Sequence, residues 1–218
     1  MKLSVKNYTV QYYNQSRALL QNFSFECPVS GLYLIQGANG AGKSTLFASL
    51  QGSLLPAHVT GKLVSDGQAL DIMSEGYKSY AHTHVGLVPQ KYDEMLAPQY
   101  TVRENLAIAL FPHIPSPIKQ LSAIQIPAIL AEINVPLDIS VESLSGGQRQ
   151  ITAIMMALQK KKNILLLDEP TATLDPANTA LVMNFLVRLC KETGILILMI
   201  CHDHELQKYT EHTPIIVK

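Results

Sequence analysis

Short runs of consecutive apolar residues recur along the chain and predict its buried strands. The runs, rich in Ile, Leu and Val, are residues 32–35, 85–88, 164–167 and 195–200. Runs of this length are typical of parallel strands that helices cover on both faces. The amino terminus differs, because Leu3, Val5 and Val10 alternate with polar residues. This alternation predicts a strand near the amino terminus.

Helical candidates lie between the strand-like runs, at residues 42–51, 146–160 and 176–191. The last one has a clear start, since Asp175 can cap it and Pro176 has the fixed φ that suits the first helical position. Strands that alternate with helices predict an α/β domain with right-handed crossovers.

Residues 90–144 depart from this alternation, because they contain no strand-like run. They hold two helical segments, 102–110 and 118–133, which prolines at positions 112, 115 and 117 separate. We interpret the stretch as a helical insertion into a single domain of residues 1–218. Residues 1–89 and 145–218 then form the α/β core of that domain.

Composition limits the classes of partner and compartment. Lys plus Arg and Asp plus Glu both number 17, so no overall charge attracts the chain to nucleic acid or to an anionic membrane. Cys27, Cys190 and Cys201 lack the spacing of a zinc site or a disulfide framework, which favours a reducing cytosol. The longest apolar run, 194–201, is shorter than the roughly 20 residues that cross a bilayer. A role at a membrane therefore requires another chain that spans it.

The glycine-rich segment after the first run fits the phosphate-binding pattern G-x-x-x-x-G-K-[ST]. Its residues are Gly37, Ala38, Asn39, Gly40, Ala41, Gly42, Lys43, Ser44 and Thr45. Backbone N–H groups and a helix start surround a phosphate there, Lys43 reaches the β and γ phosphates, and Ser44 ligates Mg²⁺. Thr45 can donate to the α phosphate. An ordinary glycine turn is the alternative, which the preceding strand and following helix disfavour.

Two carboxylates, Asp168 and Glu169, follow the run at 164–167. The carboxyl ends of parallel strands are where α/β proteins bind ligands, so we expect both carboxylates beside the glycine-rich loop. Asp168 is predicted to hold Mg²⁺, and Glu169 to act as the general base that polarises the attacking water. Without the loop, such a pair could equally serve to solvate a strand end.

A second anion site is predicted at the start of the segment 146–160. The residues are Leu144, Ser145, Gly146, Gly147 and Gln148. Ser145 can cap the helix, and the N–H groups that follow it face a potential anion. A capped helix without a ligand is the alternative interpretation.

The Leu-Ser-Gly-Gly-Gln motif lies between the glycine-rich loop and the carboxylate pair, and with the three motifs in this order the chain resembles the ABC ATPase family over essentially its whole length. The resemblance implies an α/β fold of the P-loop NTPase type, with a mostly parallel sheet core, an N-terminal antiparallel β subdomain and an inserted helical subdomain. Gln90 resembles the glutamine that touches Mg²⁺ and the attacking water, and His202 resembles the histidine that contacts the γ phosphate. Asp175 closes a segment, 173–175, that is similar to the D-loop.

The resemblance also implies the ligands. ATP and Mg²⁺ are expected, with Ser44, Gln90 and Asp168 at the metal. Tyr12 matches the aromatic residue that stacks on adenine, although the adjacent Tyr13 could serve instead. The predicted catalytic residues are therefore Glu169, His202, Gln90 and Lys43.

Family members pair head to tail, with two ATP molecules between the signature motif of one subunit and the glycine loop of the other. This chain has one copy of each motif, so a homodimer or a heterodimer with another ABC ATPase subunit is implied. Ser145 and Gly147 would then reach the γ phosphate bound by Lys43 of the partner subunit.

Two functions stay open at this point. The first is a transport ATPase on the cytoplasmic face of the membrane, attached to separate permease subunits, with residues 91–100 as the docking surface. A partly apolar groove is expected there from Tyr92, Met95, Leu96 and Pro98, although these residues could instead simply pack the helical insertion. The chain ends soon after His202, without the C-terminal regulatory domain of some import ATPases. Residues 138–142 do not resemble the extra loop of many exporters, which favours import slightly, although small single-domain subunits serve both directions. The alternative is a soluble ABC ATPase of a cytosolic assembly system, for example for iron–sulfur clusters. Nucleic acid is not an expected partner of either.

Overall fold

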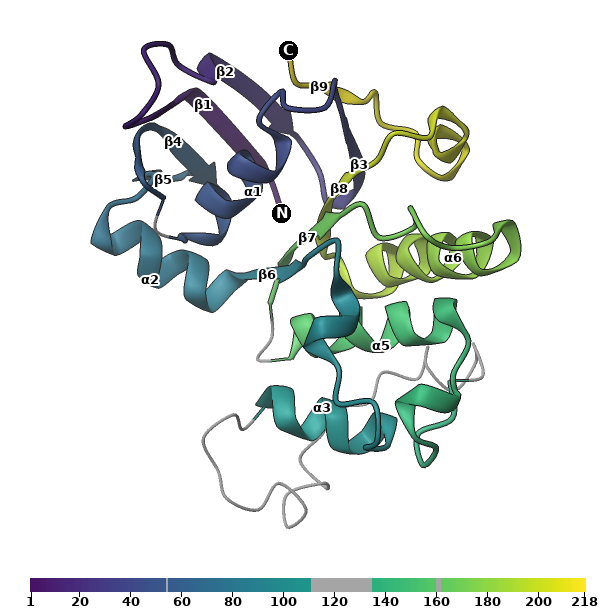
Figure 1. The fold of residues 1–218 in the computed structure, drawn as a ribbon. Helices are drawn as coiled ribbons and strands as arrows, with labels where there is room; N and C mark the ends of the chain where they lie inside the picture. Colours follow the sequence, from purple (N-terminus) through teal and green to yellow (C-terminus); the bar gives the residue numbers. More distant parts are fainter. Residues whose placement is uncertain (54, 111–134, 160–161) are drawn as a thin grey trace.

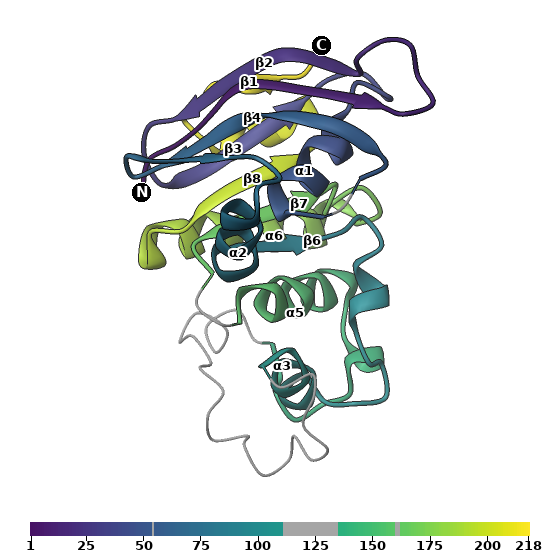
Figure 2. The same cartoon turned by 90° about the vertical axis from the view of Figure 1, so that its left-hand side faces the viewer.

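The computed structural model describes residues 1–53, 55–110, 135–159 and 162–218. These residues form two sheets and a helical part (Figure 1). Turned by 90°, the molecule shows the antiparallel strands on one side of the parallel ones, and helices α5 and α3 on the other (Figure 2). The predicted helix at 118–133 and the last predicted residue of the segment 146–160 lie outside the described residues.

The central sheet is parallel, with the strand order β6-β7-β8-β3-β9. Its strands are β3 (Gly31–Gln36), β6 (Val85–Val88), β7 (Ile164–Asp168), β8 (Leu196–Ile200) and β9 (Ile215–Ile216). The four predicted strands are thus confirmed. Strand β9 was not predicted, since it is too short to stand out in the sequence.

The second sheet is antiparallel, with the order β2-β1-β4-β5. Its strands are β1 (Leu3–Tyr12), β2 (Leu20–Cys27), β4 (Ala57–Ser65) and β5 (Gln68–Asp71). The predicted amino-terminal strand and the antiparallel β subdomain are confirmed. Asp66 and Gly67 connect β4 to β5 with φ values of 46° and 88°, which is the two-residue turn that suits a twisted hairpin.

Five α-helices are described, and four of them match predictions closely. They are α1 (Lys43–Gln51), α2 (Glu75–His84), α3 (Val102–Leu110), α5 (Gly146–Leu158) and α6 (Pro176–Thr193). Asp175 caps α6 as expected, accepting a hydrogen bond from the Asn178 N–H. Helix α2 was not predicted, because only Tyr77 and Ala81 of its ten residues are buried and its apolar pattern is weak.

The central sheet separates two hydrophobic clusters. Alternate residues of β7 illustrate this, since Leu165 and Leu167 join the cluster of α5 and α6, while Leu166 joins that of α1 and the antiparallel sheet. In the second cluster a hydrogen bond of 2.7 Å links the Tyr8 hydroxyl to Ser49, and burial raises the pKa of Tyr8 to about 12. The strands carrying the motifs are therefore held from both faces.

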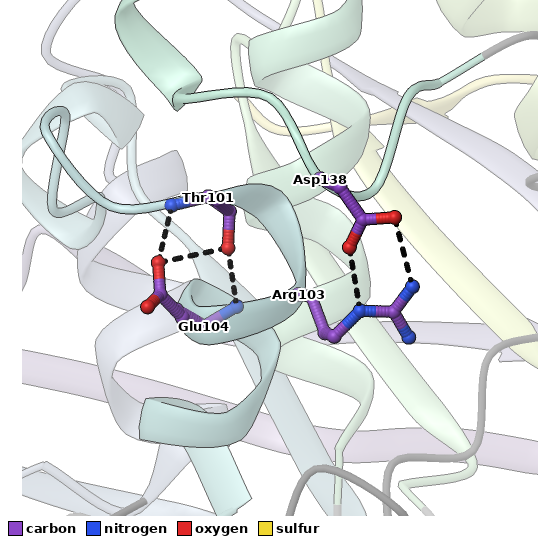
Figure 3. Close-up of polar contacts among 4 residues, drawn as sticks. All are labelled: Thr101, Arg103, Glu104 and Asp138. Atoms are coloured by element: carbon purple, nitrogen blue, oxygen red, sulfur yellow. Dashed lines mark hydrogen bonds and ion pairs between the residues drawn. The ribbon is translucent and has the colours of Figure 1, made fainter. Parts of the chain in front are cut away.

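Polar contacts near the start of α3 hold the helical part together internally (Figure 3). Thr101 and Glu104 bond each other reciprocally, and Arg103 forms two hydrogen bonds with Asp138, at 2.8 and 3.2 Å. Arg103 holds the pKa of the Asp138 carboxyl below its usual value. Buried Asn105 bonds both the N–H and the carbonyl of Ala97.

Part of the predicted docking segment turns out to be core. In the short 3₁₀ helix η1 (Tyr92–Met95), the Tyr92 side chain is buried, and so is Leu96 just after it. Both pack against the residues of α3 and α5, whereas Pro98 and Tyr100 are exposed. The apolar groove expected at 91–100 is thus narrower than predicted, because its largest side chains face inward.

Within the described part of the chain, no helix is both long and apolar enough to cross a membrane. The three cysteines are unpaired, and burial raises the pKa of Cys27 and Cys190 to about 12 and that of Cys201 to about 11. Their thiols are therefore poor nucleophiles at neutral pH.

Candidate active site

The glycine-rich loop joins the end of β3 to the start of α1. Gly42 precedes the helix with a φ of 96°, a conformation that favours glycine, and makes no side-chain cap. A Cβ atom at Gly37 would lie 2.3 Å from the backbone oxygen of Val217, next to β9. The buried Lys43 donates from Nζ to the carbonyls of Gly37 and Ala38, at 2.9 and 3.0 Å. The start of α1 is therefore uncapped and open to an anion. Lys43 meanwhile holds the loop in shape by binding two of the loop's own carbonyls.

A cavity of about 540 Å³ opens beside this loop. It is lined by Leu19, Asn39, Gly40, Gly42, Lys43, Ser44, Thr45, Gln90, Glu169 and His202. Most of the loop residues predicted from the sequence are in this list, together with three residues from distant parts of the chain. None of the signature residues 144–148 is among the described lining residues, so the second predicted anion site does not face this cavity.

Two of the distant residues, Gln90 and His202, each contact the third, Glu169. Glu169 Oε1 lies 2.9 Å from His202 Nε2, and Gln90 Nε2 donates to Glu169 Oε2 at 3.4 Å. Glu169 has a φ of 50°, although it is not a glycine and precedes a proline. This conformation is rare and costs free energy, so the strand end holds the carboxylate in a position it would not adopt by itself.

Asp168, the last residue of β7, lies close to Ser44 in the first turn of α1. Burial raises the pKa of the Asp168 carboxyl, and nearby Glu169 adds to the rise, while Ser44 and Lys43 oppose it. A partly buried carboxylate beside a hydroxyl is a pair of oxygen ligands of the kind that Mg²⁺ prefers.

The two tyrosine candidates have different surroundings. The Tyr12 hydroxyl lies 3.0 Å from the Thr45 Oγ1 in the first turn of α1. Tyr13 is 66% exposed, and its ring contacts His58 edge-on. The geometry thus favours Tyr12 as the aromatic residue beside the glycine-rich loop.

The signature motif starts α5 with a complete capping box. Gln148 N donates to Ser145 Oγ, and Ser145 N donates to Gln148 Oε1. The Ser145 Oγ and the Gly147 N–H both donate to Asn178 Oδ1, at 3.0 and 3.1 Å. Asn178 in turn bonds Asp175, and the two bonds lower the pKa of that carboxyl.

Three contacts near the motifs were not anticipated from the sequence. They are the Asn178 amide on the signature motif, the Val217 carbonyl behind the glycine-rich loop, and the Tyr92 hydroxyl on the Gly146 carbonyl at 3.4 Å. Each joins residues more than 30 positions apart. An asparagine three residues after Asp175 gave a weak signal, since asparagine is uncommon inside helices, but its target could not be read from the pattern.

Comparison with known proteins places these motifs in context. A sequence profile described as ABC transporter matches residues 20–172. The chain is 31% identical to the methionine import ATP-binding protein MetN of Escherichia coli K12 over 210 residues, covering 94% of the chain and 60% of the relative. It is 34% identical to MetN of Mannheimia succiniciproducens over 192 residues, covering 87% and 54%. The chain thus spans little more than half the length of these relatives.

Solved structures with the same fold include cbiO1 from Clostridium perfringens, part of the ABC transporter complex cbiONQ. Its TM-score is 0.79 at 27% identity, with 96% of this chain and 82% of that chain covered. The ADP conformation of MJ1267, an ATP-binding cassette of an ABC transporter, has a TM-score of 0.76 at 26% identity, with 100% and 87% covered. The predicted fold class, an α/β fold with a parallel sheet and a separate antiparallel sheet, is therefore confirmed.

Proposed function

Because this chain belongs to the ABC transporter family, we propose that it binds and hydrolyses ATP and thereby drives transport through separate permease subunits. The observation that carries the proposal is the contact of Gln90, Glu169 and His202 at the open end of the glycine-rich loop. We further propose that residues 1–218 act as one ATPase domain, with residues 90–144 as its helical insertion.

Binding of ATP follows from the loop and its lysine. The loop amides and the uncapped start of α1 receive the phosphates, since both present N–H groups and positive potential. Lys43 Nζ already sits against two loop carbonyls and would turn its donors toward the β and γ phosphates. Tyr12 would stack on adenine, a role that its position next to Thr45 supports.

The residues present fit a bound Mg²⁺. Ser44 and Asp168 already place a hydroxyl and a carboxylate together, and Gln90 lines the same cavity. Bound there, the cation would neutralise charge on the phosphate oxygens. It would also offset the cost of burying the Asp168 carboxylate.

Hydrolysis requires a base that points at the attacking water. Glu169 would accept the proton of that water. His202 and Gln90 hold the two carboxylate oxygens of Glu169 in place. Its unusual backbone conformation serves the same purpose, because it fixes the direction of the side chain. His202 would in addition contact the γ phosphate.

The signature motif completes the site from a second subunit. Ser145 and Gly147 do not line the cavity of their own chain, which supports a head-to-tail pair in which they reach the phosphate bound by the partner. We propose either a homodimer or a heterodimer with another subunit of the family. Permease subunits would hold the pair at the cytoplasmic face of the membrane.

The direction of transport is proposed as import, since the relatives are named import ATP-binding proteins. The exposed part of the segment 91–100, with Pro98 and Tyr100, is proposed as part of the permease contact. No finding favours the alternative of a cytosolic assembly ATPase.

Phosphate release from ATP tests the activity, with Glu169→Gln as the variant. Loss of the base should reduce the turnover rate by about 100-fold or more. Glu211→Gln is the matched control, because Glu211 is exposed and does not line the cavity beside the loop. Unchanged turnover in the Glu169 variant, or no ATP hydrolysis by the wild type at any protein concentration, would contradict the proposal.

A further inference from the structure

Asn178 lies outside every motif and yet contacts two of the groups that matter most for pairing. Its Oδ1 accepts hydrogen bonds from Ser145 Oγ at 3.0 Å and from Gly147 N at 3.1 Å. These are the donors expected to hold the γ phosphate of a second subunit. In the isolated chain an amide oxygen therefore sits on the donors that a phosphate oxygen would use.

The orientation of the Asn178 amide follows from its neighbours. The Gly147 N–H can only donate, so the atom facing it is an oxygen. On the other side Nδ2 donates to Asp175 Oδ2 at 2.6 Å, where a carboxylate can only accept. Asp175 Oδ1 also accepts from the Asn178 backbone N–H at 2.9 Å, which holds the Asp175 carboxylate in place. The Asn178 amide is therefore fixed through both its oxygen and its nitrogen.

The contact also depends on residue 147 being glycine. A Cβ atom there would lie 2.7 Å from Asn178 Oδ1, closer than any normal contact. The fit between α5 and α6 thus brings the amide oxygen as near to the signature N–H as a ligand would come.

We propose that the Asn178 amide oxygen occupies the signature donors in the unpaired subunit and has to release them when ATP on a second subunit arrives. This inference rests on the proposed function. Ser145 Oγ and Gly147 N each carry one hydrogen, so the phosphate and Asn178 compete for the same two hydrogens. Asn178 then sets how much ATP is needed before the subunits pair.

The test measures ATP-dependent pairing of the chain in the Glu169→Gln background by size-exclusion chromatography with light scattering. Asn178→Ala removes the competitor and should lower the ATP concentration for half-maximal pairing by roughly fivefold, as expected for two exposed neutral hydrogen bonds. Asn178→Asp places a negative charge where the negatively charged γ phosphate would bind. It should raise the ATP concentration for half-maximal pairing by roughly fivefold or more. Both changes suit the first turn of a helix.

Asn184→Ala is the control, because Asn184 is an exposed residue of the same helix and should leave the midpoint unchanged. If Asn178→Ala and Asn178→Asp both weaken pairing, Asn178 only supports the structure and the inference is wrong. Equal midpoints for wild type and Asn178→Ala would overturn it too.

Hydrogen exchange of the nucleotide-free chain separates this inference from the proposed function. The Gly147 amide should exchange several-fold faster in Asn178→Ala than in wild type, whether or not the chain pairs with itself. Failure of pairing in the Glu169→Gln chain, with faster Gly147 exchange, counts against self-pairing but not against the contact. Unchanged exchange at Gly147 overturns the inference.

Discussion

Replacing Gly37 by alanine is the sharpest test of how the glycine-rich loop is built. The added Cβ would lie 2.3 Å from the Val217 carbonyl oxygen, whereas ordinary contacts begin at 3.4 Å. The backbone at Gly37 and at Val217 is fixed by the central sheet, since Val217 N donates to Gln36 O at 2.8 Å. The loop and the end of the chain must therefore move apart.

Overpacking of this kind costs about 1–3 kcal/mol. A loss of about 2 kcal/mol should lower the melting temperature by roughly 4–8 °C in a domain of this size. Gly76→Ala is the matched control, because Gly76 lies in α2 and a Cβ there meets nothing within 4 Å. That change should stabilise the chain by about 0.5–1 kcal/mol.

Thermal melts with and without ATP distinguish folding from binding. If the loop moves to accommodate the methyl group, ATP should raise the melting temperature of Gly37→Ala less than that of wild type, because the N–H groups no longer converge on the phosphates. Equal melting temperatures for wild type and Gly37→Ala would refute the reasoning. So would a full ATP-induced rise on a destabilised background, since the clash would then not reach the binding loop.

Four further outcomes are expected. Burial raises the pKa of Asp168, so the folded chain holds that proton more tightly than the unfolded chain, and stability falls as pH rises through the folded pKa. Asp168→Asn should therefore raise the nucleotide-free melting temperature at pH 7, with a gain that shrinks toward pH 4, while a lower melting temperature at pH 7 would contradict this. Tyr8→Phe should cost about 1–3 kcal/mol in denaturant unfolding, because it leaves the buried Ser49 hydroxyl without its partner, and a neutral change would count against it. The buried thiols of Cys27 and Cys201 should react with iodoacetamide only after unfolding, and fast labelling of either in the native chain would disprove their burial. Tyr12→Ala should raise the KM for ATP several-fold and Tyr13→Ala should not, whereas the reverse order would assign the stacking role to Tyr13.

Features that depend only on residues close together in the chain could be predicted from the sequence. Apolar runs located the strands of the parallel sheet, and the capping chemistry of Asp175 and Ser145 located two helix starts. Glu169 was found from its place after a strand-like run, whereas Gln90 and His202 were assigned through the resemblance to the family. Their mutual hydrogen bonds could be inferred only from the fold.

Contacts between distant segments were beyond the reach of the pattern. Tyr92 and Leu96 are apolar enough for either a docking surface or a core, and only the packing of η1 on α5 decided between the two. The pairing of β9 with β3 joins residues about 180 positions apart and leaves no periodic trace. A short stretch of sequence is enough to predict a strand or a helix start, whereas the contact partner of a side chain depends on how the whole chain folds.

Ser145 uses one hydroxyl group for two purposes. Its oxygen accepts the Gln148 N–H that starts α5, and its hydrogen points away to another acceptor. Since the lone pair and the hydrogen are separate, the hydrogen can change acceptors while the helix start stays intact. Threonine keeps both abilities and alanine removes both, so no alanine scan at this position can tell a folding defect from a binding defect. Engineering of the signature motif has to begin with the acceptor, not with the serine.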